Sequence, residues 1–226
     1  MFSQRALQIS PSPTLSIDAR AKQLKSEGRD IIGFGAGEPD FDTPLHIREA
    51  AIVALNQGFT RYTPASGIPE LKEAVCRKFS RDNNLHYEQQ QIVISNGAKH
   101  SLSNIFAAIL NEGDEVIIPI PFWVTYPELV KLYGGTPVFV ETKKEHSYKL
   151  RGPALKKVLS PRTKALILNS PGNPAGQVYN REELEELATV SLESNLYIIS
   201  DEIYEKLIYN EAKHYSIASL GEKIKN

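Results

Sequence analysis

The sequence contains one cysteine, no long apolar run and almost no net charge. The single cysteine, Cys76, excludes an internal disulfide and a thiolate metal cluster. Its position in a helical pattern predicts a packed, inert thiol rather than a catalytic one. The balance of 26 Lys+Arg against 27 Asp+Glu gives a net charge of -1, which predicts no nucleic-acid partner. The longest apolar runs have the length of strands, so no membrane span is predicted, and residues 1–15 lack the apolar segment of a secretion signal. These absences indicate a cytoplasmic enzyme or binding protein.

Two common nucleotide-binding motifs are also absent. Asp201 and Glu202 follow an apolar strand, as in a Walker B segment, but no GxxxxGK[ST] phosphate loop accompanies them. The glycines of "GFGAGEP" (33–39) have the spacing G-x-G-x-G, and they lead into a proline-containing loop instead of a helix. A nicotinamide site of the G-x-G-x-x-G type is therefore not predicted.

From Gln89 onward, short β-rich runs alternate with helical patterns, which is typical of a parallel sheet wrapped by helices. The runs are continuously apolar, as expected when both faces of the sheet are covered. The sequence therefore predicts an α/β fold with a mainly parallel sheet and helices on both faces. The expected strands are 92–95, 115–120, 136–141, 164–169 and 196–200, and the expected helices are 98–113, 125–135, 152–159 and 180–195.

The first part of the chain has a different pattern. Helices are expected over 16–28, 43–58 and 69–83, and "IIGFG" (31–35) is expected to form a strand. The second of these helices has Thr43 as its expected cap and Pro44 in its first turn. We predict that residues 1–43 form an N-terminal arm and the start of a small domain. Residues 44–226 are then most of a large ligand-binding domain.

In open α/β sheets, ligands bind outside the carboxyl ends of the strands, so the residues that follow each strand are the candidate site. A helix that opens at Gly97-Ala98-Lys99 suits a phosphate, and the ring of Trp123 can stack on an aromatic ligand. Asn173 and Tyr204 are hydrogen-bond donors, and Asp201 can pair with a basic ring nitrogen. Each residue alone has an ordinary explanation as a surface lysine, a packed ring or a turn residue. Together they predict a phosphorylated, nitrogen-containing aromatic ligand, and pyridoxal phosphate has all of these groups.

Several motifs occur in one order along the chain: "GAGEPDFDTP", "YTPASGIPELKEA", "NGAKHSL", "PFWVTYPEL", "NSPGNPAGQVY" and "SDEIYEKLIY". In these motifs the chain resembles the fold type I aminotransferases of the aspartate aminotransferase superfamily, and most closely their bacterial Ib-like branch. The resemblance covers almost the whole chain. Two departures are Gly172, where the family often has Asn, and Ala175, where it often has Thr.

The resemblance implies a cofactor, pyridoxal 5'-phosphate, and a role for each matching residue. Gly37 would donate its backbone N–H to the substrate carboxylate, and Tyr62 would reach the cofactor phosphate of the neighbouring subunit in a homodimer. The implied cofactor-binding residues are Tyr62, Gly97, Ala98, Lys99, Trp123, Asn173, Asp201 and Tyr204, and the implied substrate-binding residues are Gly37, Trp123 and Asn173. The resemblance also implies a cis Asn173–Pro174 bond.

The family's Schiff-base lysine lies in a Ser-x-x-Lys or Ser-x-Ser-Lys segment, and no lysine of this sequence has that context. The remaining candidates are Lys206, Lys213, Lys223 and Lys225. The chain is therefore expected to be the N-terminal part of an aminotransferase, with no catalytic lysine and no activity alone. The expected reaction of the whole protein moves an amino group between an aspartate- or glutamate-like L-amino acid and a 2-oxo acid.

Two alternatives remain open at this stage. The same fold could perform other pyridoxal chemistry, such as β-elimination by a lyase, and residues round the substrate side chain would discriminate. The chain could also be a catalytically silent protein that binds phosphorylated ligands, which the gene sequence after Asn226 would decide.

Overall fold

The computed structural model describes residues 2–35, 37 and 39–225, and it contains two compact units. One unit is Ser10–Ile68, and the other combines the residues up to Ile9 with those from Pro69 onward. The expected domain division, 1–43 and 44–226, stays a prediction. Among the described residues, no helix is both long enough and apolar enough to cross a membrane.

The unit Ser10–Ile68 contains two of the expected helices, α2 (Pro13–Ser26) and α3 (Leu45–Asn56). Two details of the prediction are wrong. Thr43 does not cap α3, because Pro44 occupies the N-cap position and makes no side-chain hydrogen bond there. The described residues 31–35 form no strand, and Ile32 and Phe34 are exposed. An apolar run becomes a strand only where a neighbouring strand completes its hydrogen bonds.

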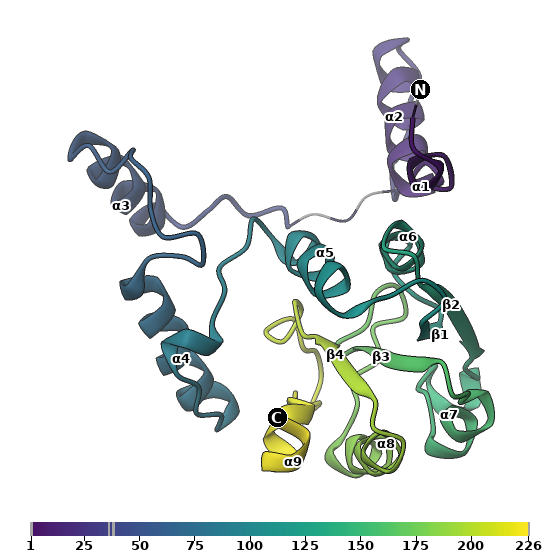
Figure 1. Ribbon diagram of the computed structural model, residues 1–226. Helices are drawn as coiled ribbons and strands as arrows, with labels where there is room; N and C mark the ends of the chain where they lie inside the picture. Colours follow the sequence, from purple (N-terminus) through teal and green to yellow (C-terminus); the bar gives the residue numbers. More distant parts are fainter. Residues whose placement is uncertain (1, 36, 38, 226) are drawn as a thin grey trace. The chain divides into compact units, whose positions relative to one another are not determined.

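The second unit is built on a parallel sheet, which confirms the predicted fold class. Its strands are β1 (Glu115–Ile120), β2 (Thr136–Glu141), β3 (Thr163–Asn169) and β4 (Tyr197–Asp201). In the described part of the chain they form one sheet in the order β2-β1-β3-β4, and every neighbouring pair is parallel (Figure 1). The prediction of a strand at 92–95 is wrong, since those residues pair with no strand that the structure describes.

Helices connect the strands as expected. Each connection between consecutive strands contains a helix. The helix α8 starts with a capping box between Asn180 and Glu183. The helices of this unit are α1 (Gln4–Leu7), α4 (Pro69–Asn83), α5 (Ala98–Ile109), α6 (Thr125–Leu132), α7 (Gly152–Val158), α8 (Arg181–Glu193) and α9 (Glu222–Lys225). Short 3₁₀ turns are η1 (Gln89–Gln91), η2 (Lys144–His146) and η3 (Ile217–Leu220).

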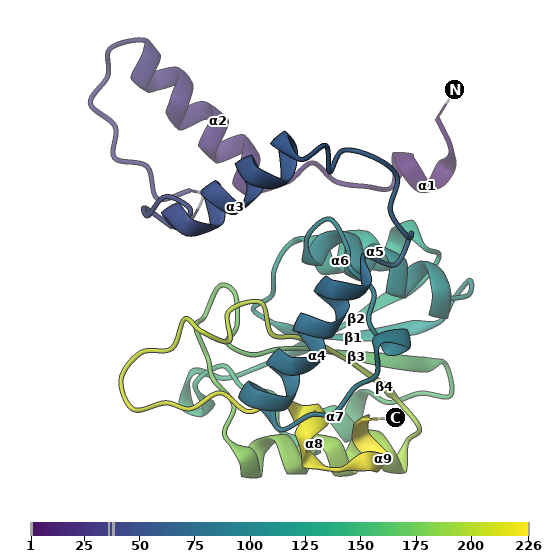
Figure 2. The same ribbon diagram turned by 90° about the vertical axis from the view of Figure 1, so that its left-hand side faces the viewer.

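The central strands are buried on both faces because successive side chains point to opposite sides. Val116 and Ile118 of β1 pack with α5 and α6, whereas Ile117 packs with α7 and α8. The same alternation occurs in β3, where Leu166 lies on the side of α7 and α8 and Ile167 on the other. Figures 1 and 2 show α5 and α6 on one side of the sheet and α7 and α8 on the other. These two cores fix the strands, and therefore fix the residues at their carboxyl ends.

Candidate functional site

A pocket opens at the carboxyl ends of β3 and β4, where the sequence predicts a ligand site. Its volume is about 100 Å³, far above the roughly 10–15 Å³ that one water molecule needs. The lining residues are Ala98, Trp123, Tyr126, Asn169, Asn173, Asp201, Ile203 and Tyr204. Five of the predicted residues thus meet at one place: Ala98, Trp123, Asn173, Asp201 and Tyr204.

Asp201, the last residue of β4, is the acidic group of this pocket. Asp201 is 9% exposed and Tyr126 is 2% exposed. Oδ2 of Asp201 accepts a 2.7 Å hydrogen bond from the hydroxyl of Tyr126. Oδ1 accepts from the backbone N–H of Ile203 at 3.2 Å. Burial and the charge of Asp201 raise the pKa of Tyr126 well above its usual range, so this phenol remains a donor. Among the described residues, no ion pair involves Asp201. A buried carboxylate with donors and no cation is suited to a positively charged ligand.

Asn169, at the end of β3, connects the two strand ends and the following loop. Its Nδ2 donates to the backbone oxygens of Asp201, at 2.9 Å, and Pro171, at 3.1 Å. Its Oδ1 accepts from the backbone N–H of Asn173 at 2.8 Å. One amide group therefore sets the position of Asn173 relative to Asp201.

The start of α5 and Trp123 also line the pocket. Gly97 has φ of 83°, a left-handed conformation that suits glycine, and it is the N-cap of α5. Ala98 lines the pocket, while Gly97 and Lys99 are its neighbours in the chain. The Lys99 Nζ lies 5.0 Å from the centre of the Trp123 ring, which itself packs edge-on against Tyr126 at 5.5 Å. This arrangement brings a helix N-terminus, a cation and an aromatic face together.

Two predicted residues, Gly37 and Tyr62, belong to the unit Ser10–Ile68, and both are exposed within the described chain. Their roles toward substrate and cofactor stay predictions.

The loop after β3 contains the predicted cis bond between Asn173 and Pro174, which is confirmed. The Ile120–Pro121 and Ser170–Pro171 bonds are also cis. Backbone hydrogen bonds close this loop, from Gly172 N to Gln177 O at 2.9 Å and from Gly176 N to Gly172 O at 2.8 Å.

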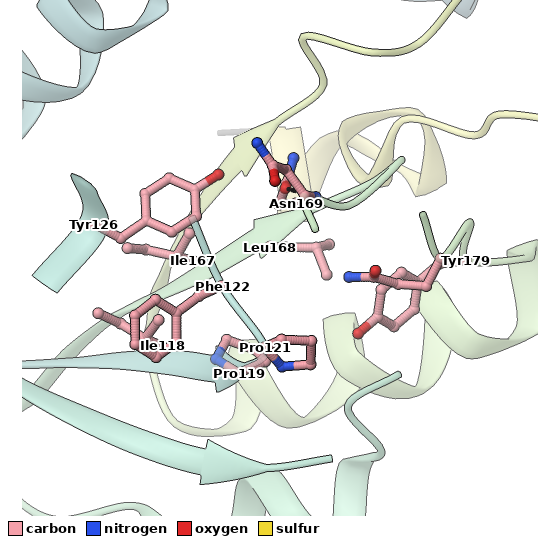
Figure 3. Close-up of a pocket in the computed structure, with 11 residues that line it drawn as sticks. Ile118, Pro119, Pro121, Phe122, Tyr126, Ile167, Leu168, Asn169 and Tyr179 are labelled. Carbon is pink, nitrogen blue, oxygen red and sulfur yellow. Dashed lines mark hydrogen bonds between the residues drawn. The ribbon is translucent and has the colours of Figure 1, made fainter. Parts of the chain in front are cut away.

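A second, smaller cavity lies behind the pocket. Figure 3 shows it between the rings of Phe122 and Tyr126 on one side and Tyr179 on the other, with Asn169 above. Its volume is about 20 Å³, which is room for about one water molecule. Tyr126, Asn169 and Asn173 line both spaces and so form the wall between them.

Gly172 and Gln177 explain one departure from the family pattern. A Cβ at position 172 would overlap the side-chain amide of Gln177, so this amide occupies the place of a side chain there. We expect Gly172→Asn to lower the free energy of unfolding of the full-length protein by no more than about 1 kcal/mol, because the atoms in its way are the end of the flexible Gln177 side chain, which can turn aside. In a Gln177→Ala background the same substitution should cost much less. Urea denaturation of the two single variants and the double variant measures this coupling.

Ala175→Thr, at the other departure, is the matched control, since Ala175 is exposed and should tolerate the change. Equal losses from Gly172→Asn in both backgrounds would contradict the packing of Gln177 over Gly172.

Tyr126 and Asn169 are residues of this site that the sequence patterns do not predict. Tyr126 lies three residues after Trp123, and its buried, aromatic character resembles ordinary core packing. Asn169 was assigned to the end of a strand, although it is the first polar residue after the apolar run "KALIL". A rule that includes the last residue of each strand and the first helical turn beyond it would have found both.

A parallel sheet with a polar pocket at the carboxyl ends of its strands defines an α/β ligand-binding fold. Residues 29–225 match the family model "Aminotransferase class I and II". The aspartate aminotransferase of Bacillus sp. (strain YM-2) is 54% identical over 225 residues, which is 100% of this chain and 57% of that protein. A probable aspartate/prephenate aminotransferase of Aquifex aeolicus is 50% identical over 225 residues, with the same coverage.

Among solved structures, the aspartate aminotransferase from Thermus thermophilus with maleate superposes with a TM-score of 0.95 at 46% identity. The match covers 97% of this chain and 57% of that one. The chain belongs to the class I and II aminotransferases. It spans a little over half the length of the relatives that it matches.

Proposed function

We propose that this chain forms the cofactor-binding part of an aminotransferase that uses pyridoxal 5'-phosphate. The reaction would transfer an amino group between an aspartate- or glutamate-like L-amino acid and a 2-oxo acid. The observation that carries this proposal is the buried carboxylate of Asp201, held by Tyr126 and facing a pocket with an aromatic wall. The relatives described above are an aspartate aminotransferase and a probable aspartate/prephenate aminotransferase, which supports the substrate class.

The residues present fit this cofactor. Asp201 would pair with the pyridine nitrogen and hold a proton on it, since its carboxylate has no cationic partner among the described residues. Trp123 would stack on the ring, and the start of α5 at Gly97, Ala98 and Lys99 would hold the phosphate. When bound, the cofactor supplies a pyridine ring that accepts electron density from the reacting carbon of the substrate.

The remaining residues would orient the two ligands. Asn173 and Tyr204 line the same pocket, where their side chains can donate hydrogen bonds to the ring oxygen. Asn173 would also bind the substrate carboxylate together with Gly37, and Tyr62 would reach the phosphate in a partner subunit of a homodimer. The lysine that binds the cofactor covalently would come from the part of the family fold that these residues do not match. These roles and the homodimer rest on the family pattern.

The test is an assay of the full-length protein reconstituted with pyridoxal phosphate. We expect formation of oxaloacetate from aspartate with 2-oxoglutarate as acceptor, in a ratio of one glutamate per oxaloacetate. Release of free ammonia without glutamate would instead indicate elimination chemistry. Failure to bind pyridoxal phosphate would exclude both reactions.

A further inference from the structure

The function proposed above uses Asp201 and leaves Glu202, the other acid of the "SDEIY" segment, without a role. Successive side chains at the end of a strand point to opposite sides. Asp201 contacts Tyr126, whereas Glu202 contacts His214 and Ser216, which lie twelve and fourteen positions later in the chain. The two acids therefore have separate partners.

Both carboxylate oxygens of Glu202 accept hydrogen bonds from side chains. Oε1 accepts from the hydroxyls of Ser200, at 2.6 Å, and Ser216, at 2.9 Å. Oε2 lies 3.0 Å from Nε2 of His214, which therefore donates to it. The side chains are 16% exposed for Glu202 and 8% for His214. We call this group, Ser200, Glu202, His214 and Ser216, the Glu202 clasp.

The Glu202 clasp joins the two ends of the loop 203–213, which carries Tyr204. This loop has little apolar packing of its own, because Ile203, Leu207 and Tyr209 are all exposed. Backbone hydrogen bonds occur in its first turn, from Glu205 N to Glu202 O at 2.9 Å and from Leu207 N to Tyr204 O at 2.8 Å. A loop with few buried contacts opens easily unless its ends are held. The clasp supplies this restraint beside the pocket.

A second attachment connects the same loop to α4. Glu205 accepts from Lys78 Nζ at 2.6 Å and from Asn83 at 3.3 Å, and Lys206 pairs with Asp82 at 3.0 Å. Burial alone would raise the pKa of Glu205, but the hydrogen bonds from Lys78 and Asn83 outweigh it and the pKa lies below its usual value. Glu205 is therefore an ionised anchor at neutral pH.

Glu202, Glu205 and His214 offer ligand atoms within 4.8 Å of one another, as a metal site would. The geometry favours a structural cluster instead. Lys78 already supplies a positive charge to Glu205, and the proton on His214 Nε2 faces Glu202. A metal ion would have to displace Lys78 and would require the proton of His214 to move to Nδ1, which is buried and has no hydrogen-bond partner among the described residues.

We propose that Glu202 and His214 are positioning residues, which hold Asp201 and Tyr204 in place for the cofactor. Glu202 lies between these two residues in the chain, so a fixed Glu202 side chain restrains the backbone on both sides. This inference rests on the proposed function for its catalytic consequence, although the restraint of the loop can be measured independently.

The test compares Glu202→Gln and His214→Ala with Glu211→Gln in the full-length holoenzyme. Glu211 is an exposed acid of the same loop, so the control makes the same chemical change outside the clasp. In the clasp variants we expect amide exchange over 203–213 to be at least about tenfold faster. We also expect kcat to fall by about tenfold to 10²-fold with a smaller change in KM. The visible absorption band of the cofactor should shift. Glu211→Gln should change none of these.

A folded Glu202→Gln variant with unchanged amide exchange and unchanged kcat would overturn the proposal. Loss of wild-type activity with EDTA, restored by Zn²⁺, would also overturn it and show a metal site. If the wild-type protein transfers no amino group, the proposed function fails, and the exchange measurement still decides whether the clasp restrains the loop.

Discussion

Asp201→Ala in the full-length protein is expected to lower kcat for amino transfer by about 10²–10³-fold. In the proposed reaction this carboxylate would hold a proton on the pyridine nitrogen, and without it the ring would accept electron density less well. The fold should survive, since Asp201 lies at the edge of the sheet and outside both apolar cores. Steady-state kinetics with aspartate and 2-oxoglutarate measure the effect.

The matched control is Glu193→Gln, which removes an acid from the exposed end of α8, where it pairs with Lys156 at 2.9 Å. That variant should retain wild-type kcat, because surface ion pairs contribute little. Circular dichroism of both variants separates a catalytic loss from unfolding. Near-normal turnover of a folded Asp201→Ala protein would mean that the acid has another task.

Tyr126→Phe is expected to lower the free energy of unfolding of the cofactor-free, full-length protein by about 1.5–3 kcal/mol. The change leaves Oδ2 of Asp201 buried without its donor, and hydrogen bonds to charged groups are worth about this much. Urea denaturation at pH 7 measures the loss. The comparison is Tyr133→Phe, which removes a partly buried contact with the neutral hydroxyl of Ser103 at 2.6 Å and should cost only about 0.5–1.5 kcal/mol.

The pKa of Tyr126 makes the difference in unfolding free energy between wild type and Tyr126→Phe depend on pH. Because the pKa is raised in the folded state, the neutral phenol is favoured there, while the unfolded chain loses the proton near pH 10. The stabilisation is fully present below about pH 10 and declines as the pH rises further. The gap between wild type and Tyr126→Phe should therefore narrow above pH 10. A gap that widens there would show that Tyr126 ionises more easily in the folded protein.

The sequence predicted the parallel sheet and most helices because continuous apolar runs and capping residues are local signals. The strands expected at 115–120 and 136–141 have the observed bounds, and α8 begins one residue after the expected start, Asn180, which is its N-cap. The expected strands at 31–35 and 92–95 failed for a common reason. A local pattern shows that a segment can be extended, but it does not show whether another strand lies beside it.

The candidate site shows the same limit. Trp123, Asn173, Asp201 and Tyr204 lie at or after the ends of strands that the structure contains, and they line one pocket with Ala98, although the strand expected before Ala98 does not form. Tyr126 and His214 were not found, because each acts on an acid that is distant in sequence, 75 and 12 residues away. Such contacts depend on how helices and loops return to the sheet, which no short motif encodes.

The wall of Tyr126, Asn169 and Asn173 has a consequence for protein engineering. The same three side chains also border the small cavity. Substitutions in that cavity can therefore alter the packing of these side chains without replacing them. Ile118 and Leu168 line the rear cavity and are not among the residues that line the pocket. Both residues are core positions, so we expect changes of side-chain volume there to shift the wall at some cost in stability, while the groups that face a ligand stay the same. A library built on such rear positions would retune the shape of the pocket and leave its functional groups unchanged.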